Sequence, residues 1–120
     1  MTLTLDHHQR LNVGALLGML ECRTVRETRD AWKLMDRLTL DDREREAIEF
    51  VVQSQNGNEV YSWNPLKTLP AREYDFSDSE LRQVERALNS APRFIPGQMR
   101  RWLEPLLAQM PEPVESNGNR

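Results

Sequence analysis

The chain has 120 residues, of which 38% are hydrophobic and 29% are charged, and its formal net charge is -3. This length suits one domain, and a chain of this size buries roughly two-thirds of its unfolded surface in a single core. The sequence has no apolar run near the ~18 residues that would suggest a membrane span, and its acidic balance argues against a strong overall attraction to nucleic acid or anionic lipid.

The first residues and the cysteine content indicate where the protein works. Residues Met1–Arg10 lack the basic segment and following apolar stretch of a secretory signal. Cys22 is the sole cysteine, so an internal disulfide is excluded and stability must come from burial and helix capping. We therefore expect a cytoplasmic protein that has no contact with a membrane.

The N-terminal segment predicts a short strand followed by a helix. Leu3 and Leu5 alternate with polar residues, as in a strand with one buried face. Asp6 and Gln9 have the spacing of a helix cap, and the apolar residues after them continue to Leu20. Two glycines inside this helix cost about 1 kcal/mol each relative to alanine, so we expect it to depend on tertiary packing or to end early.

Two further helices are predicted across a very short connection. Thr24 and Glu27 form a capping box that starts a helix ending near Arg37. Its buried face is predicted from spacings of three and four, which select Val25, Thr28, Trp32 and Met35. Thr39 caps the next helix, predicted over residues 41–53. The pair is typical of a helical hairpin or a helix-turn-helix unit.

A small sheet is predicted in the middle of the chain. The sequence Asn56-Gly57-Asn58 favours a turn, and strand-forming residues follow it at 59–63. Residues 72–76 alternate charged and aromatic side chains, which predicts a second, half-buried strand. We expect these two strands to pair, and whether Leu3–Leu5 joins them as a third strand stays open.

The C-terminal part predicts two more helices and a tail. Ser77 and Glu80 form a capping box for a helix that ends at Pro92, and Pro96 starts a last helix that Pro105 should kink or split. The sequence thus predicts an α+β fold that is mostly helical, with about four helices and a small two- or three-stranded antiparallel sheet. We expect one globular domain over residues 1–110 and a disordered tail over residues 111–120.

The sequence offers little material for catalysis or for cofactor binding. His7, His8 and Cys22 are the soft metal ligands, and adjacent histidines on a strand would point to opposite faces. The glycines form no phosphate-binding loop. The carboxylates of residues 41–49 are expected on an exposed helix face, where the helix dipole favours those of the first turn. We therefore predict no enzyme, no metal and no cofactor.

One basic stripe suggests an anionic partner. At spacings of three, four and four, the second predicted helix carries Arg26, Arg29, Lys33 and Arg37. Such a stripe would bind the phosphates of a nucleic acid. The alternative is an ordinary salt-bridged surface in which Asp30 pairs with Arg26 and Asp36 with Lys33. The acidic start of the following helix opposes insertion into a DNA groove.

The large apolar residues are divided between core and surface. Trp32 and Trp102 lie on predicted buried stripes, whereas Trp63 lies beside a loop and suits either place. For contact with a protein partner or a second copy of the chain, the candidates are Trp63, Met99, Leu107 and Met110. Tryptophan is common in binding hot spots, and methionine tolerates irregular surfaces.

Residues 3–107 contain, in order, a Leu-rich start, Asp36 with Leu38, Trp63 before a loop, and Phe76 with a Glu80-capped helix. This order of cues resembles small phage or prophage proteins of unknown function. This resemblance implies an accessory protein of a mobile element and assigns no catalytic residue. We expect a non-enzymatic module that associates with a protein or with itself, and nucleic-acid binding through the basic stripe is the alternative.

Overall fold

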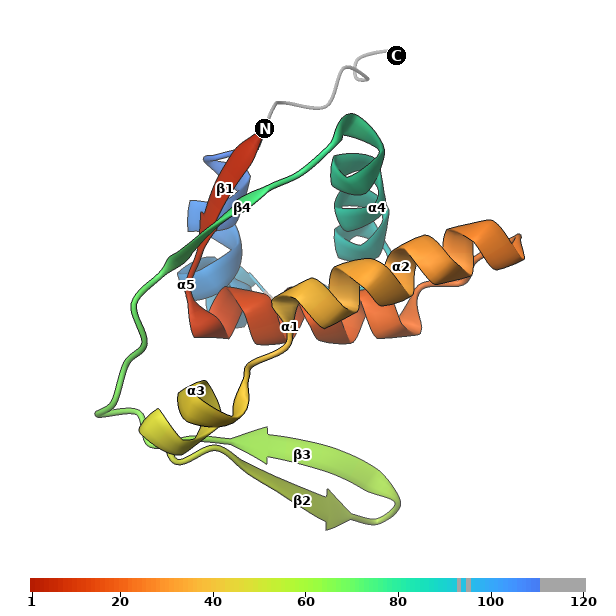
Figure 1. The fold of residues 1–120 in the computed structure, drawn as a ribbon. Coiled ribbons are helices and arrows are strands. Elements are labelled where there is room, and N and C mark those ends of the chain that lie inside the picture. Colours follow the sequence, from red (N-terminus) through yellow and green to blue (C-terminus); the bar gives the residue numbers. More distant parts are fainter. Residues whose placement is uncertain (93, 95, 111–120) are drawn as a thin grey trace.

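The computed structural model describes residues 1–92, 94 and 96–110, and in these the chain is α+β and mostly helical (Figure 1). The elements in chain order are β1 (Thr2–Leu5), α1 (His7–Met19), α2 (Val25–Leu38), α3 (Asp42–Ala47), β2 (Val51–Gln55), β3 (Asn58–Ser62), β4 (Arg72–Asp75), α4 (Asp78–Asn89) and α5 (Pro96–Leu107). The strands form two separate two-stranded antiparallel sheets. The predicted tail, 111–120, lies outside the described residues. Within these residues, no helix has the length and apolar content needed to cross a membrane.

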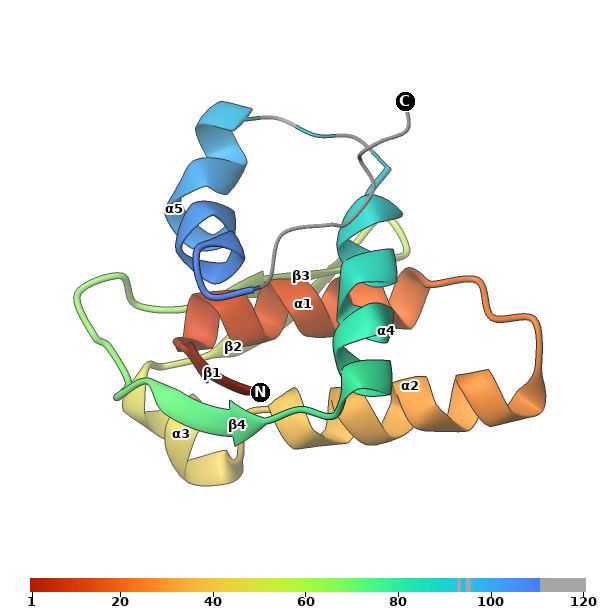
Figure 2. The same ribbon diagram turned by 90° about the horizontal axis from the view of Figure 1, so that it is seen from above.

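Helix α1 lies at the centre of the molecule. It packs against β1 and three helices, α2, α4 and α5 (Figure 2). Strand β1 turns Leu3 and Leu5 inward, to 1% and 2% exposure, while Thr2 and Thr4 face solvent, as the alternation predicts. The core is completed by residues of β4, α4 and α5. The central core is therefore formed by the two ends of the chain together with α2, and the segment between α2 and β4 contributes little to it.

Polar caps start α1, α2 and α4 where the sequence predicts them, whereas the predicted cap of the third helix is wrong: Asp41 caps α3, and Thr39 is the C-cap of α2. Asp6 and Gln9 form a reciprocal capping box at α1, and so do Ser77 and Glu80 at α4. At α2, Thr24 accepts a bond from the Glu27 N–H at 3.1 Å, but the glutamate side chain instead pairs with Arg86 of α4. These caps satisfy backbone groups that the first turn leaves unpaired, so the helix starts are fixed locally.

The predicted helix over residues 41–53 is wrong beyond its first turns. Helix α3 ends at Ala47, Ile48 is completely buried, and Glu49 takes a positive φ of 57° that reverses the chain into β2. The turn that follows has positive φ at both Asn56 (52°) and Gly57 (81°), which defines a type I′ turn between two strands. The tight turn and the β-branched residues of β2 favour a hairpin over a longer helix.

The predicted pairing of residues 59–63 with residues 72–76 is also wrong. β3 pairs with β2, with Gln53 opposite Val60, whereas β4 pairs with β1, with Leu3 opposite Tyr74. The two-residue turn brings β2 to β3 at almost no loop-closure cost. The pairing of β4 with β1 places Tyr74 and Phe76 against the core leucines, so burial decides this second pairing.

Helix α2 buries a different face from the predicted one. Ala31, Leu34 and Leu38 are buried, whereas Val25 is 70% exposed and Trp32 is 58% exposed. The expected core role of Trp32 is therefore wrong. Ala31, Leu34 and Leu38 also lie at spacings of three and four. Their side chains are narrower than that of Trp32 and fit better against α1.

Helix α5 continues through Pro105 to Leu107, so the predicted split at this proline is wrong. The predicted burial of Trp102 is correct, since it is 5% exposed. Gln9 donates to the Trp102 carbonyl at 3.1 Å and joins α1 to α5 inside the core. Helix α5 is held by this bond and by the apolar face that contains Leu106.

A buried ion pair joins α1 to α3. Arg10 is 1% exposed and donates to both carboxylate oxygens of Glu44, at 2.6 and 3.0 Å. The same guanidinium donates to the carbonyls of Leu38 and Thr39, which end α2, and lies 5.9 Å from the Tyr74 ring centroid. The expectation that all the acids of residues 41–49 face solvent is therefore wrong for Glu44, which is 8% exposed. This pair is the main polar link between the core and the segment that carries the hairpin.

The ion pair predicts the effect of removing Glu44. Glu44→Ala leaves the guanidinium of Arg10 buried without its carboxylate, so we expect the free energy of unfolding to fall by about 3–5 kcal/mol. Chemical denaturation, monitored by circular dichroism, measures this loss of stability. Glu46→Ala, at an exposed position of the same helix, is the control and should change stability by less than about 0.5 kcal/mol. Equal losses in the two variants would contradict the role given to the pair.

Candidate functional site

A groove of about 730 Å³ separates the β2–β3 hairpin from helices α1 and α2. Its helical wall consists mainly of small and apolar residues, namely Leu11, Gly14, Ala15, Gly18, Met19 and Met35. Its other wall is the hairpin side, with Phe50, Val52 and Tyr61. Arg45 and Glu59 supply charge on the hairpin side. A concave and mostly apolar surface of this kind suits the docking of an apolar group.

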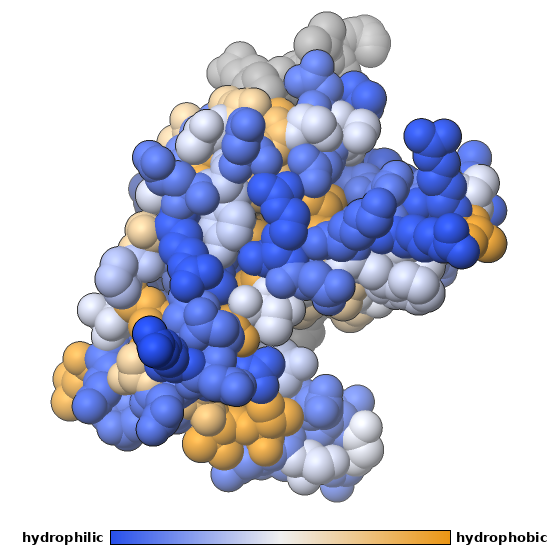
Figure 3. Space-filling model, in the orientation of Figure 1, coloured by the Kyte–Doolittle hydropathy of each residue, from blue (hydrophilic) through white to orange (hydrophobic). Residues whose placement is uncertain are grey.

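The hairpin exposes apolar side chains on both of its faces. All ten residues of β2 and β3 are exposed. Val52 and Tyr61 are directly opposed in the register and face the groove, at 46% and 45% exposure, while Val51 and Val60 belong to the other face at 45% and 40%. Figure 3 shows hydrophobic surface on the hairpin, bordered by hydrophilic side chains. The hairpin thus offers apolar contact area without a core against which to bury it.

The base of the hairpin is held firmly. The Ile48 carbonyl accepts a bond from the Asn64 N–H at 2.9 Å, which closes the hairpin behind the buried Ile48 side chain. Phe50 contacts Tyr61, with ring centroids 5.5 Å apart, and the guanidinium of Arg45 lies 5.7 Å from the Phe50 ring. The hairpin is therefore fixed in direction at its base while its strands remain exposed.

A second attachment connects the hairpin to the start of α1. Trp63 directly follows β3, and its ring meets the edges of His7 and His8 at centroid distances of 5.4 and 5.5 Å. The two histidines are the first residues of α1, so their expected position on a strand is wrong. Burial lowers the pKa of both imidazoles, against the opposing effect of Asp6. Both rings therefore remain neutral at neutral pH and pack as aromatic groups.

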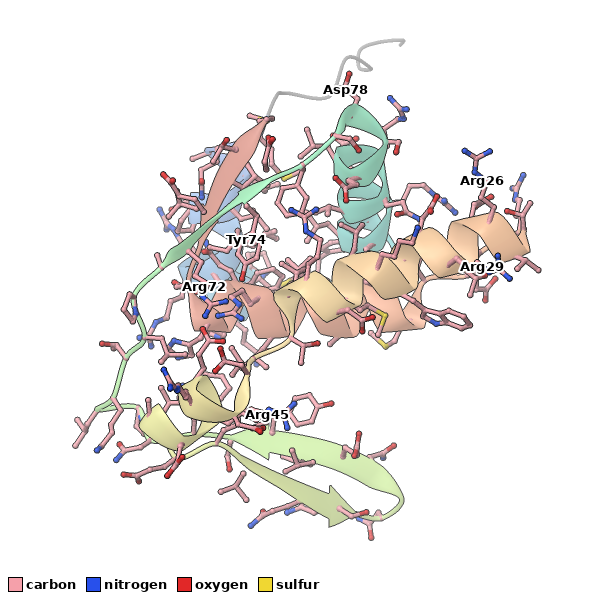
Figure 4. All side chains as sticks on the ribbon, in the orientation of Figure 1. Arg26, Arg29, Arg45, Arg72, Tyr74 and Asp78 are labelled. Atoms are coloured by element: carbon pink, nitrogen blue, oxygen red, sulfur yellow. The ribbon has the colours of Figure 1, made fainter. Side chains whose placement is uncertain are left out.

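All four residues of the basic stripe are exposed, but the guanidinium of Arg37 is bonded within the fold. Arg37 donates to Glu80 at 2.8 Å and to the Asp75 carbonyl at 2.8 Å, and it lies 5.0 Å from the Phe76 ring. It thus joins α2 to β4 and α4, and its charge is already paired with Glu80. Arg26, Arg29 and Lys33 have no acidic partner among the described residues, and Figure 4 shows the two arginines at the end of α2 far from α3.

The predicted partner-binding residues do not form one surface. Met110 is 8% exposed and belongs to the core cluster, so its expected role at an interface is wrong. Met99 packs against the same core, Trp63 is half-buried beside the histidines, and Leu107 is 51% exposed on α5. Exposed apolar side chains do gather on the hairpin and beside the groove, and others, among them Val25, Trp32, Leu66 and Phe94, lie elsewhere.

Sequence reasoning missed the hairpin although a signal for it was present. Asn56-Gly57 lies between two five-residue runs, of which the first begins with Val51-Val52 and the second contains Val60-Tyr61, and this is a strong hairpin pattern. The predicted helix over residues 41–53 includes the first three residues of β2, so the strand on that side of the turn is not predicted. The exposure of Trp32 had no comparable signal, because it depends on which face of α2 meets α1.

Comparison with known proteins gives no relative on which to base a function. The chain matches no family model, no curated protein and no solved structure. Among the described residues, no three His, Cys, Asp or Glu side chains are grouped in a way that would hold a metal ion. The function must therefore be argued from the surface itself.

The position of Trp32 predicts a simple spectroscopic result. Trp32→Phe should remove most of the emission that acrylamide quenches and should change stability by less than about 0.5 kcal/mol, because the ring is already in water. Trp102→Phe, the buried counterpart, should remove blue-shifted emission and cost about 1–3 kcal/mol. Unchanged quenching in the Trp32→Phe variant would contradict the exposure of this ring.

Proposed function

We propose that this protein is a non-enzymatic interaction module that binds another protein chain through the β2–β3 hairpin and the adjacent groove. The observation that supports this is the hairpin itself, whose ten strand residues are all exposed. A two-stranded hairpin alone is at best marginally stable in water, since it has no hydrophobic face to bury. A partner that covers the hairpin would bury the apolar side chains that the rest of the fold leaves exposed.

The groove supplies the chemistry for such a partner. Its helical wall is apolar and has open space at Gly14, whereas the Met35 side chain packs over Gly18, and Tyr61 on the hairpin offers an aromatic ring with a polar end. Tyrosine at the centre of a contact provides a large area at a low entropic cost. The occupant that fits is a protein segment with apolar side chains directed into the groove. We propose the cytoplasm as the compartment for this binding, because a chain with Cys22 as its sole cysteine needs no oxidising environment.

The groove can be tested without altering the β2 edge. Met19→Ser combined with Tyr61→Ser removes one apolar contact from each wall, and the partner should bind at least about tenfold more weakly. The proteins that bind to the tagged wild-type chain are compared with those that bind to the tagged variant. A protein that binds to the wild type but not to the variant is then purified, and its affinity for both chains is measured by calorimetric titration.

The matched control removes exposed apolar groups outside the groove. Val60→Ser combined with Leu66→Ser changes one residue on the other hairpin face and one in the following loop, which is 90% exposed. This control should bind like the wild type. The proposal is overturned when the groove variant retains the same proteins, with the same affinity, as the wild-type chain.

A second candidate function, nucleic-acid binding, is supported by the end of α2. Arg26, Arg29 and Lys33 are exposed and have no acidic partner in the part of the chain that the structure describes, and Trp32 lies among them in sequence with 58% of its surface exposed. An exposed aromatic ring beside cations is the arrangement that binds single-stranded nucleic acid, through base stacking and phosphate contacts. Arg37 takes no part in this site.

A retardation assay at low salt tests this candidate. Replacement of Arg26, Arg29 and Lys33 by glutamine should weaken binding of a single-stranded oligonucleotide and reduce the slope of log K against log salt by about 2–3. The control, in which Arg43, Lys67 and Arg100 become glutamine, changes the net charge equally and should bind like the wild type. Absence of wild-type binding at low salt, or equal losses in the two variants, excludes this function.

The biological setting is a separate proposal. The resemblance to phage and prophage proteins supports an accessory role in a mobile element. Flanking genes for capsid, regulatory or restriction proteins would support this setting, and their absence would count against it.

A further inference from the structure

We propose that the partner of the hairpin is a second copy of this chain, with β2 of one copy pairing antiparallel to β2 of the other. This inference rests on the proposed interaction function and names its partner. It follows from three features of β2: its position at an open edge, the direction of its backbone groups, and its lack of charge.

The first feature is the open edge. β2 pairs with β3 alone among the described strands, and in Figure 1 it lies on the side of the hairpin away from α1. The end of β3 is attached to α1 through Trp63, which contacts His7 and His8. An approaching strand therefore has a freer path to β2 than to β3.

The second feature is the direction of the backbone groups. Gln55 and Asn58 flank the type I′ turn, so they form a hydrogen-bonded pair, and such pairs alternate along an antiparallel ladder. Gln53 and Val51 therefore direct their N–H and C=O groups to β3. Val52 and Ser54 direct theirs outward, and the structure gives these groups no partner among the described residues. A strand edge with outward donors and acceptors is a template for another strand.

The outward groups determine one symmetric register. Pairing centred on Gln53 places Val52 opposite Ser54 of the partner copy, and Ser54 opposite Val52 of the partner copy. Each of these pairs exchanges both of its N–H···O=C bonds. A register shifted toward the hairpin base would need the N–H of Phe50, which is already bonded to the Arg45 carbonyl at 2.8 Å. The arrangement is a closed two-fold dimer with a continuous four-stranded sheet.

The third feature is the absence of protection against self-pairing. Proteins usually protect open edges with lysine, proline or a bulge. β2, with the sequence Val-Val-Gln-Ser-Gln, has no charge and no proline. Two copies therefore meet without charge repulsion, and Val52 and Tyr61 of both copies lie on one continuous face beside the two grooves. The pairing completes the sheet that a lone hairpin lacks.

Sedimentation equilibrium of the full chain over a wide concentration range tests the dimer, because a contact below about 1,200 Å² gives a weak complex. We expect a reversible monomer–dimer equilibrium. Ser54→Pro removes an outward N–H and leaves the β2–β3 ladder intact, so the dimer should weaken at least about tenfold. Glu59→Pro makes the same change at the outer edge of β3 and should dimerise like the wild type.

Charges at the symmetry axis test the register without a change in the backbone. In Gln53→Lys, two lysines oppose each other, and the dimer should weaken about two- to fivefold. Gln53→Glu should do the same, and an equal mixture of the two variants should recover the affinity of the wild type as heterodimers. Gln55→Lys, on the same strand and face, opposes Val51 of the partner copy and should have little effect.

The outcomes separate this inference from the proposed function. A chain that stays monomeric at every concentration, or a dimer that Ser54→Pro and the Gln53 variants leave unchanged, overturns the β2 pairing. If the chain is monomeric but Met19→Ser with Tyr61→Ser abolishes binding of another protein, the interaction function stands without self-pairing. If neither set of variants changes any association, both proposals fail. Circular dichroism and amide exchange at the hairpin confirm that each variant is folded.

Discussion

The ion pair between Arg10 and Glu44 is the constraint on which the layout of this molecule depends. Arg10 lies inside α1, and its guanidinium reaches Glu44 of α3 and the last carbonyls of α2. Burial is the largest single effect on Arg10 and disfavours its charge, but the bond to Glu44 and the charge interactions with Tyr74, Glu44 and Asp41 together outweigh it, so the pKa of Arg10 is raised. The bond to Arg10 lowers the pKa of Glu44. Glu44 also accepts the Asp41 N–H and lies 3.4 Å from Arg72. One carboxylate thus joins the α1 core, the end of α2, the cap of α3 and the start of β4.

This attachment explains how an exposed hairpin keeps a defined direction. The apolar core is formed by the two ends of the chain and α2, and from the segment between α2 and β4 it is Ile48 and Leu40 that supply fully enclosed apolar side chains. The segment is held by the Arg10–Glu44 pair on one side and by the contact of Trp63 with the histidines on the other. With both ends fixed, β2 and β3 extend over α1, and a groove remains between them. The exposed strands are a consequence of this arrangement and the basis for the proposed association.

A surface that combines an open strand edge with an apolar groove favours recognition through backbone and side chains together. Edge pairing supplies affinity through main-chain bonds, whereas the groove beside it selects side chains. The same chain presents a separate basic end on α2, where Trp32 is exposed. These two regions lie on different elements, so binding at the hairpin leaves the end of α2 available.

The sequence alone determined the local features: the α+β class, the starts of α1, α2 and α4, the turn at Asn56-Gly57, and the alternation of Leu3 and Leu5. Each of these depends on side chains that satisfy neighbouring backbone groups or on a short periodic pattern, so no distant contact was needed. Tertiary structure decided the rest. The face of α2 that is buried, the pairing of β4 with β1, the burial of Glu44 and the exposure of Trp32 all depend on which partner lies opposite, since spacings of three and four along α2 allow more than one buried face. The hairpin edge became a candidate site only when the fold left it uncovered.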